Sequence, residues 1–151
     1  MSSLPQPRLP AAYNHDEMAD LLACGARVTG TPAARAAAWL LAASTLPGTP
    51  AFAAHVTVTA QPDPGRRGRV ALAAHVNSWR ELTDDLAMQS AGDDLRLLAL
   101  ADSYATRTPV NLSLVGTRLS PAAARAAAEA ALIAAGHDHL LHVTTSLEPG
   151  S

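Results

Sequence analysis

The pattern of residues 52–76 limits the possible folds more than any other part of this chain. In residues 52–60 the even-numbered positions are apolar, and histidine and threonine alternate with them from residue 55 onward. Residues 62–68 combine proline, aspartate and glycine, which is typical of a turn. Apolar alternation resumes in residues 70–76. Because successive side chains of a strand point to opposite faces, this pattern predicts an antiparallel hairpin with one apolar face.

Four other points carry signals for the start of a helix. Residues 14–17 and 78–81 have the spacing of a capping box, with Asn or Ser followed three residues later by Glu. Residues 31–32 and 120–121 each combine a capping hydroxyl with a proline suited to the first helical turn. We therefore expect a helix after each signal, and we expect the last helix to end at Gly136.

Residues 94–104 are compatible with either a helix or a strand. Their Leu and Ala content favours a helix, yet their apolar side chains also alternate. We interpret the segment as a strand, because a turn at 106–109 leads to another alternating stretch at 110–114. With a last strand at 141–147, the order after an N-terminal helix pair would be ββα-ββα-β. The predicted class is α+β, with a mostly antiparallel sheet covered on one face by helices. The side chains expected in the core include Trp39, Val56, Val58, Leu72 and Val143.

The length of 151 residues fits one domain. We expect a flexible Pro-rich segment at 1–12, a single α+β domain at 13–147 and a flexible tail at 148–151. Cys24 is the only cysteine, so no intramolecular disulfide can form. Without an apolar run long enough for a signal peptide or a membrane span, we expect a cytoplasmic protein that does not enter membranes. The absence of lysine and the excess of alanine indicate a GC-rich bacterial genome.

The polar face of the predicted sheet carries the first candidate ligand-binding residues, which are His55, His75, Asn111 and His142. His55 and His75 each lie ten residues from Gly65, so a turn centred there would place them opposite one another. Their Cβ atoms would then be about 4.5–5.5 Å apart. A shift of two residues would preserve the faces and separate the histidines. Three imidazoles on one face could bind a divalent metal or transfer protons, whereas the simpler interpretation is a solvent-facing polar surface.

Two weaker candidates lie outside that face. His137 and His139 alternate just past a helix end and could reach one metal ion, but no third ligand is assigned. A histidine at that place also interacts favourably with the helix dipole. Arg66, Arg67 and Arg69 form the only basic cluster and could contact nucleic-acid phosphates, although a solvated turn is the simpler interpretation.

Three classes of function remain. We favour a small soluble non-enzymatic interaction or accessory protein without a cofactor, which self-associates as a homodimer through its sheet face or its Ala-rich helices. Ala53, Ala71 and Ala73 on the outer face would permit close approach of a second copy. The alternative is a small enzyme or metal-binding protein that uses the histidine-bearing face. The third is a nucleic-acid accessory protein that uses the arginine turn, although the net charge of −2 argues against nucleic acid as a partner.

Overall fold

The computed structural model describes residues 4–110, 118–137 and 141, and within them it shows an α+β fold with one two-stranded antiparallel sheet. The elements in chain order are η1 (Pro10–Ala12), α1 (His15–Thr29), α2 (Pro32–Ala43), η2 (Leu46–Gly48), α3 (Pro50–Ala53), β1 (Val56–Pro62), β2 (Val70–Val76), α4 (Trp79–Ala87), α5 (Gly92–Thr106) and α7 (Pro121–Ala134). The predicted class and the hairpin are therefore confirmed. Among the described residues, no helix is both long enough and apolar enough to cross a membrane.

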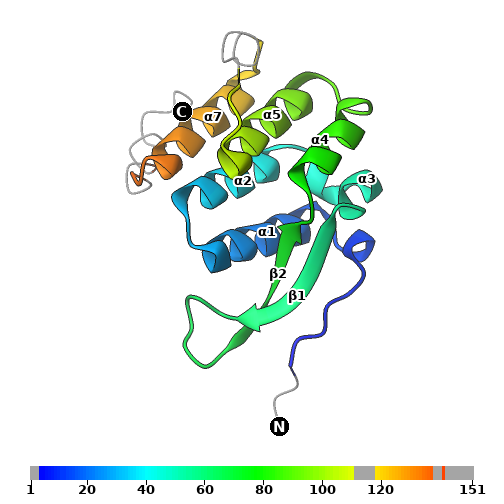
Figure 1. Cartoon of the computed structure of the whole chain (residues 1–151), viewed down its shortest axis with the longest axis vertical. Coiled ribbons are helices and arrows are strands. Elements are labelled where there is room, and N and C mark those ends of the chain that lie inside the picture. Colours follow the sequence, from blue (N-terminus) through cyan, green and yellow to red (C-terminus); the bar gives the residue numbers. More distant parts are fainter. Residues whose placement is uncertain (1–3, 111–117, 138–140, 142–151) are drawn as a thin grey trace, which may run out of the picture.

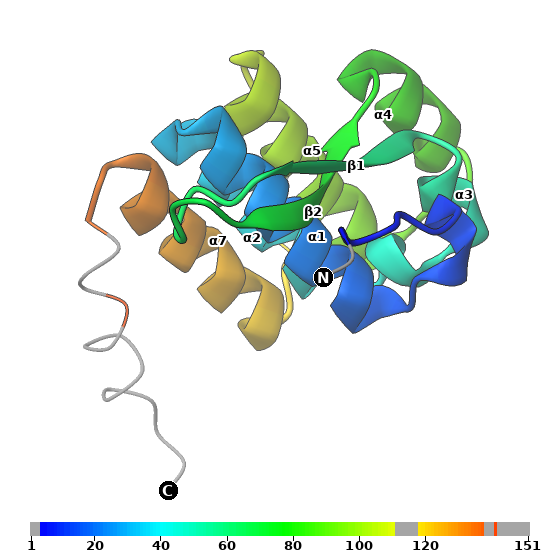
Figure 2. The same ribbon diagram turned by 90° about the horizontal axis from the view of Figure 1, so that it is seen from below.

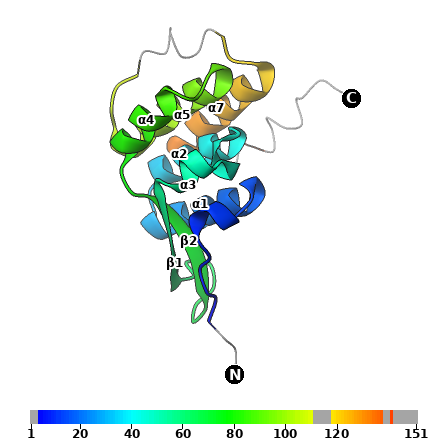
Figure 3. The ribbon, with the colours of Figure 1, turned by 90° about the vertical axis from the view of Figure 1, so that its right-hand side faces the viewer.

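Helix α2 lies at the centre of the helical part of the molecule. It packs against α1, α5 and α7, and α1 in turn packs against β2 (Figure 1). Figure 3 shows the hairpin at one end of the molecule, with α5 and α7 at the other. The buried residues of α2 are Ala36, Ala37, Ala38, Leu40 and Leu41. Because alanine adds little volume to a helix surface, several helices can approach α2 closely.

Helix α1 covers the outer edge of β2. A Cβ atom on Gly25 would lie 2.1 Å from the carbonyl oxygen of Ala74, so only glycine permits this approach. The backbone amide of Asn77 donates to the carbonyl of His55, which places the odd-numbered residues of β2 in the hydrogen-bonded pairs. The Ala74 carbonyl therefore points away from β1 and toward α1. The helix thereby shields a strand edge that would otherwise be open to another chain, as Figure 2 shows from the hairpin side.

The predicted core is confirmed in part. Val56 and Val58 are buried, and Leu72 is partly buried against the core. Trp39 was expected in the core, but the structure leaves it 40% exposed. It lies on α2 between Ala38 and Leu40, outside the face that packs on the other helices. Val143 lies outside the described residues.

The strand predicted at 94–104 is wrong, because residues 92–106 form helix α5. Leu97, Leu98 and Ala101 are buried together, which is the spacing of one helical face and not of alternate strand positions. The second ββα unit therefore does not form there. Within the part of the chain described, the sheet has two strands, and residues 111–117 and 142–147 of the other predicted strands lie outside it.

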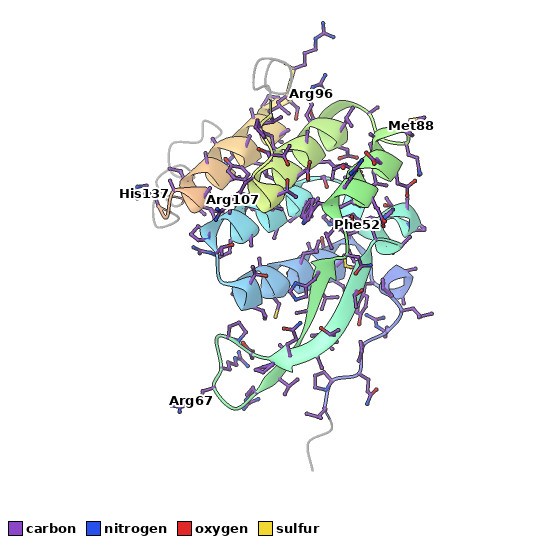
Figure 4. All side chains as sticks on the ribbon, in the orientation of Figure 1. Phe52, Arg67, Met88, Arg96, Arg107 and His137 are labelled. Carbon is purple, nitrogen blue, oxygen red and sulfur yellow. The ribbon has the colours of Figure 1, made fainter. Side chains whose placement is uncertain are left out.

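The first predicted strand also starts too early. Thr49 caps a short helix by accepting a hydrogen bond from the backbone amide of Phe52, with Pro50 in its first turn. Phe52 is consequently a helical residue, and it is fully buried (Figure 4). Apolar alternation alone did not separate this helical turn from the strand that begins at Val56.

Candidate ligand-binding site

The two histidines of the hairpin are not cross-strand partners. The observed register pairs Thr57 with His75 and Val58 with Ala74, a shift of two residues from the register expected with Gly65 at the turn centre. The faces are kept, but the proposed contact between His55 and His75 is wrong. The turn is held by Asp63, whose side chain accepts a hydrogen bond from the backbone amide of Gly65 at 2.8 Å. This Asp-centred turn sets a register that composition alone did not predict.

His55 instead joins the start of the hairpin to α4. Its Nε2 lies 2.7 Å from a carboxylate oxygen of Asp85, and the other oxygen of Asp85 accepts from the amide of Gln89 at 3.1 Å. The His55 side chain is only 16% exposed, whereas that of Asp85 is 46% exposed. The pair therefore connects two elements at the surface of the helical body.

His75 faces a different part of the molecule. Its Nε2 lies 3.1 Å from the amide nitrogen of Gln61, which also donates to the hydroxyl of Thr59. A neutral imidazole accepts at Nε2 in this arrangement and carries its proton on Nδ1. The Cε1 atom would lie 3.3 Å from a Cβ on Gly25, so the ring lies beside α1. The expectation that His75 points away from the helices is therefore wrong.

The other predicted site residues stay predictions. Asn111, His139 and His142 lie outside the described residues. His137 follows Gly136, which has a positive φ of 81°, and its backbone amide donates to the carbonyl of Leu132 at 2.7 Å. This bond closes the end of α7. Over the described part of the chain, no three His, Cys, Asp or Glu side chains gather closely enough to hold a metal ion.

The arginine turn is exposed at the tip of the hairpin. Arg66, Arg67 and Arg69 all lie on the surface there, and Figure 4 shows Arg67 pointing away from the helical body. The backbone amide of Asp63 donates to the carbonyl of Arg69 and closes the turn. A role of these residues in nucleic-acid contact stays a prediction.

The alanines expected to form a free outer sheet face are covered within the chain. Ala73 is fully buried, and Ala53 is a buried residue of α3 and not part of a strand. Ala71 is partly buried. The small-residue face on which the prediction of self-association was based is therefore already packed against other parts of the same molecule.

A cleft of about 410 Å³ lies between α1, α2, β2, the start of α4 and the end of α5, and we call it the His75 cleft. Its floor is built of small and aliphatic side chains from the two N-terminal helices and β2. Its polar and aromatic side chains come from elements far apart in sequence. These side chains are Thr29, Thr31, His75, Trp79, Tyr104 and Arg107.

Arg107 has an unusual backbone at the edge of this cleft. It is the residue that ends α5, with φ of 59° and ψ of 30°, and it is the only non-glycine residue with positive φ in the described ranges. This left-handed conformation is costly for a residue with a Cβ and usually falls to glycine at a helix end. Tyr104 lies one helical turn earlier on α5. Neither side chain has a hydrogen bond or ion pair within residues 4–110, 118–137 and 141.

Sequence reasoning found His75 and missed Tyr104, Trp79 and Arg107. The available signal was the spacing of Tyr104 and Arg107, which are three residues apart and share a face only in a helix. Reading that segment as a strand concealed this relation. The position of His75 beside α1 depends on long-range packing and had no local signal.

A second hollow of about 400 Å³ lies between α1, α2 and α7, and we call it the Trp39 groove. Alanines of α1 and α2 form much of its wall, with Ile133 and Leu141 on the other side, and the charged residues Asp20, Arg27 and Arg35 also line it. Trp39 lies at this groove, which accounts for its exposure. Ala26 and Ala38 line both hollows, so the α1–α2 pair is a shared wall.

A smaller hollow of about 250 Å³ lies between α4 and α5 and contains Asp102. Burial raises the pKa of the Asp102 carboxyl, and the nearby charge of Asp84 raises it further, against a hydrogen bond from Thr106 that lowers it. This hollow is also lined by Val110, the last described residue before 111–117.

Comparisons with protein-family models, with curated proteins and with solved structures find no match to this chain.

Proposed function

We propose that this chain is a small non-enzymatic binding protein that holds a ligand in the His75 cleft. The observation that carries the proposal is the arrangement of polar groups around an apolar floor. Ligand sites in proteins are typically concave and mostly apolar, with a few polar groups that orient the ligand, and their volumes are about 300–1,000 Å³. The His75 cleft has this composition, and its volume of about 410 Å³ falls within this range.

The contacts of the histidines support a binding role over a catalytic one. His55 bonds to Asp85 at the junction of the hairpin and α4, and it does not line the cleft. His75 lines the cleft and bonds to the amide of Gln61. A general base normally needs a nucleophile within hydrogen-bond reach and a group that orients the base. The amide of Gln61 orients the His75 ring, which suffices for binding.

The two tryptophans allow a direct test, because Trp79 lines the cleft and Trp39 lines the other groove. The Trp39→Phe variant leaves Trp79 as the only tryptophan, and Trp79→Phe leaves Trp39. A library of small acids, bases and neutral compounds is screened by ligand-observed NMR, and binders are titrated against both variants. We expect binders to change the fluorescence of Trp79 and to leave that of Trp39 unaltered.

Two variants, each of which adds side-chain volume to one of the two hollows, complete this test. Ala34→Leu adds volume at the His75 cleft, and Ala42→Leu adds the same volume at the Trp39 groove. Both positions are partly exposed helix residues, where leucine is well tolerated. We expect Ala34→Leu to abolish binding and Ala42→Leu to preserve it. A library without any compound that responds to Ala34→Leu would refute the proposed function.

Self-association is a second proposal, now supported by the Trp39 groove. A large aromatic side chain that is 40% exposed beside a hollow with alanine-rich walls is typical of interface anchors. We expect a second copy of this chain to cover it. Sedimentation velocity over a wide concentration range would show a dimer that Trp39→Gln weakens at least about tenfold, as is typical of a central aromatic anchor. Trp79→Phe serves as the control and should leave the dimer intact, and a monomer at all concentrations would refute the proposal.

A further inference from the structure

We propose that the ligand of the His75 cleft is a small organic carboxylate with an apolar body. This inference rests on the proposed function and specifies its ligand. It is carried by the charges that line the cleft, by the unpaired polar groups at the end of α5 and by the apolar floor.

The charge of the cleft has one sign. Arg107 is the only lining residue with a permanent charge, and no Asp or Glu of the described chain lines the cleft. The guanidinium carries several N–H donors in a planar fork, which matches the two oxygens of a carboxylate. A cationic ligand would find no counter-charge here, whereas an anionic one would find Arg107.

The position of Arg107 makes its side chain available to a ligand. Within the described residues, the guanidinium has no acidic partner that would have to be displaced. Figure 4 shows Arg107 at the end of α5, close to the start of α2. The left-handed backbone at Arg107 is easier for glycine than for arginine. A side chain kept at such a position despite the conformational cost is consistent with a functional role.

Two further donors stand in the same cleft. The Tyr104 hydroxyl lies one turn before Arg107 on α5 and has no hydrogen bond within the described residues. On the opposite wall lies the His75 ring, whose Nε2 is 3.1 Å from the amide nitrogen of Gln61; in the tautomer that carries its proton on Nδ1, this second ring nitrogen is a donor. A carboxylate accepts hydrogen bonds only, so this set of donors suits it.

The rest of the cleft selects an apolar body. The floor is made of side chains without hydrogen-bonding groups, which are Leu22, Ala26, Ala33, Ala34, Ala37, Ala38, Leu41, Ala74, Val76 and Ala105. A fully polar anion such as inorganic phosphate would leave this surface uncovered. An alkyl or aryl group attached to the carboxylate would bury it, at about 25 cal/mol for each Å² of apolar area removed from water.

The test uses matched probes that differ only in their polar end. Octanoate and 1-octanol are titrated separately into the full chain carrying Trp39→Phe, with Trp79 fluorescence and calorimetry as readouts. We expect octanoate to bind at least about tenfold more tightly than 1-octanol, because charge-assisted hydrogen bonds exceed neutral ones. Inorganic phosphate should compete weakly or not at all.

Two variants test whether the difference in affinity between octanoate and 1-octanol depends on Arg107. Arg107→Gln should weaken octanoate binding about tenfold and leave 1-octanol binding unchanged. Arg67→Gln, at the exposed hairpin tip, is the matched control and should change neither. Equal affinities of the two probes, or an Arg107→Gln variant that retains full affinity for octanoate, would overturn the carboxylate assignment. Binding of both probes that Ala34→Leu abolishes would still leave the proposed cleft function in place, so the two failures are distinguishable. If neither probe binds but the library yields other ligands of the cleft, the carboxylate inference is overturned and the proposed binding function of the cleft stands.

Discussion

The His75 cleft and the Trp39 groove share the wall formed by α1 and α2, and they differ in the residues that lie opposite this wall. Both are lined by alanines of α1 and α2, and Ala26 and Ala38 belong to both. On one side, β2 and α5 add His75, Tyr104 and Arg107 to this wall. On the other side, Ile133 of α7 and Leu141 add apolar side chains. Helices α1 and α2 also add Asp20, Arg27 and Arg35 to the groove, so the two hollows differ both in the element that packs against the shared wall and in the charges that the wall carries.

The largest expected effect concerns Gly25, which lines the cleft and not the groove. In Gly25→Ala, the new Cβ would lie 2.1 Å from the Ala74 carbonyl oxygen, so α1 and β2 must separate. We expect the free energy of unfolding in urea to fall by about 2 kcal/mol, although alanine is the better helix former. Ligands of the cleft should be lost, while Trp39 fluorescence should change little.

Gly65→Ala is the control for Gly25→Ala. The nearest atom to a Cβ at Gly65 is 3.5 Å away, and the backbone there is not in the left-handed region. We expect its stability to stay within about 0.5 kcal/mol of the parent chain. A Gly25→Ala variant as stable as Gly65→Ala would contradict the close approach of α1 to β2.

The second prediction separates the two hairpin histidines. His55→Ala should cost about 1 kcal/mol of unfolding free energy, because it removes the bond to Asp85 and the surface position of Asp85 limits the loss. It should barely alter ligand affinity, since His55 does not line the cleft. His75→Ala should reduce affinity and cost less stability. Urea unfolding measures the loss of stability in both variants, and calorimetry measures their loss of ligand affinity. A larger loss of affinity in His55→Ala and a larger loss of stability in His75→Ala would show that the two histidines have exchanged roles.

The third prediction is that stability and ligand binding change in opposite directions when Arg107 is replaced by glycine. Arg107→Gly relieves the left-handed backbone and should raise the unfolding free energy by up to about 1 kcal/mol. The same change removes the guanidinium and should weaken the binding of octanoate. Arg107→Gln keeps the conformational cost and isolates the loss of charge. A destabilised Arg107→Gly variant would show that the side chain contributes to the fold.

Local signals predicted those parts of the molecule that local chemistry determines. The capping box of Asn14 and Glu17 is present with both reciprocal bonds, and Thr31 and Ser120 cap their helices as expected. The burial of Val56 and Val58 was also predicted, but it did not test the register, because a shift of two residues leaves each face unchanged.

The remaining features depend on contacts between distant segments. The pairing of His55 with Asp85 and the closeness of α1 to Ala74 follow from how the hairpin packs on the helices. Nothing within a few residues of these positions signals such contacts. The cleft was missed for the same reason, since its walls combine residues from Leu22 to Arg107. Even the helical spacing of Tyr104 and Arg107 becomes useful only once α5 is known to be a helix.

The smallest predicted effect acts on the wall that both hollows share. His15 begins α1 and joins it to the end of α2, because its Nε2 lies 2.7 Å from the carbonyl oxygen of the buried Ser44. Its Nδ1 lies 3.1 Å from a carboxylate oxygen of Asp16. Since both neighbours are oxygen acceptors, only the imidazolium form can donate to both. The hydrogen bond to Asp16, followed by that to the Ser44 carbonyl, raises the pKa of His15 above 6.5.

The sign of the pH effect follows from this raised pKa. The stabilisation by protonated His15 is fully present below the unfolded value of 6.5, and it is lost as the pH rises through the higher pKa of the folded state. We therefore expect the thermal midpoint to fall modestly from pH 6 to pH 8.5, and this fall should be smaller in His15→Gln. His55→Gln is the matched control and should keep the His15-dependent part. Because His15 holds the shared α1–α2 wall, the loss should affect the cleft and the groove alike, and a change confined to one hollow would contradict this role.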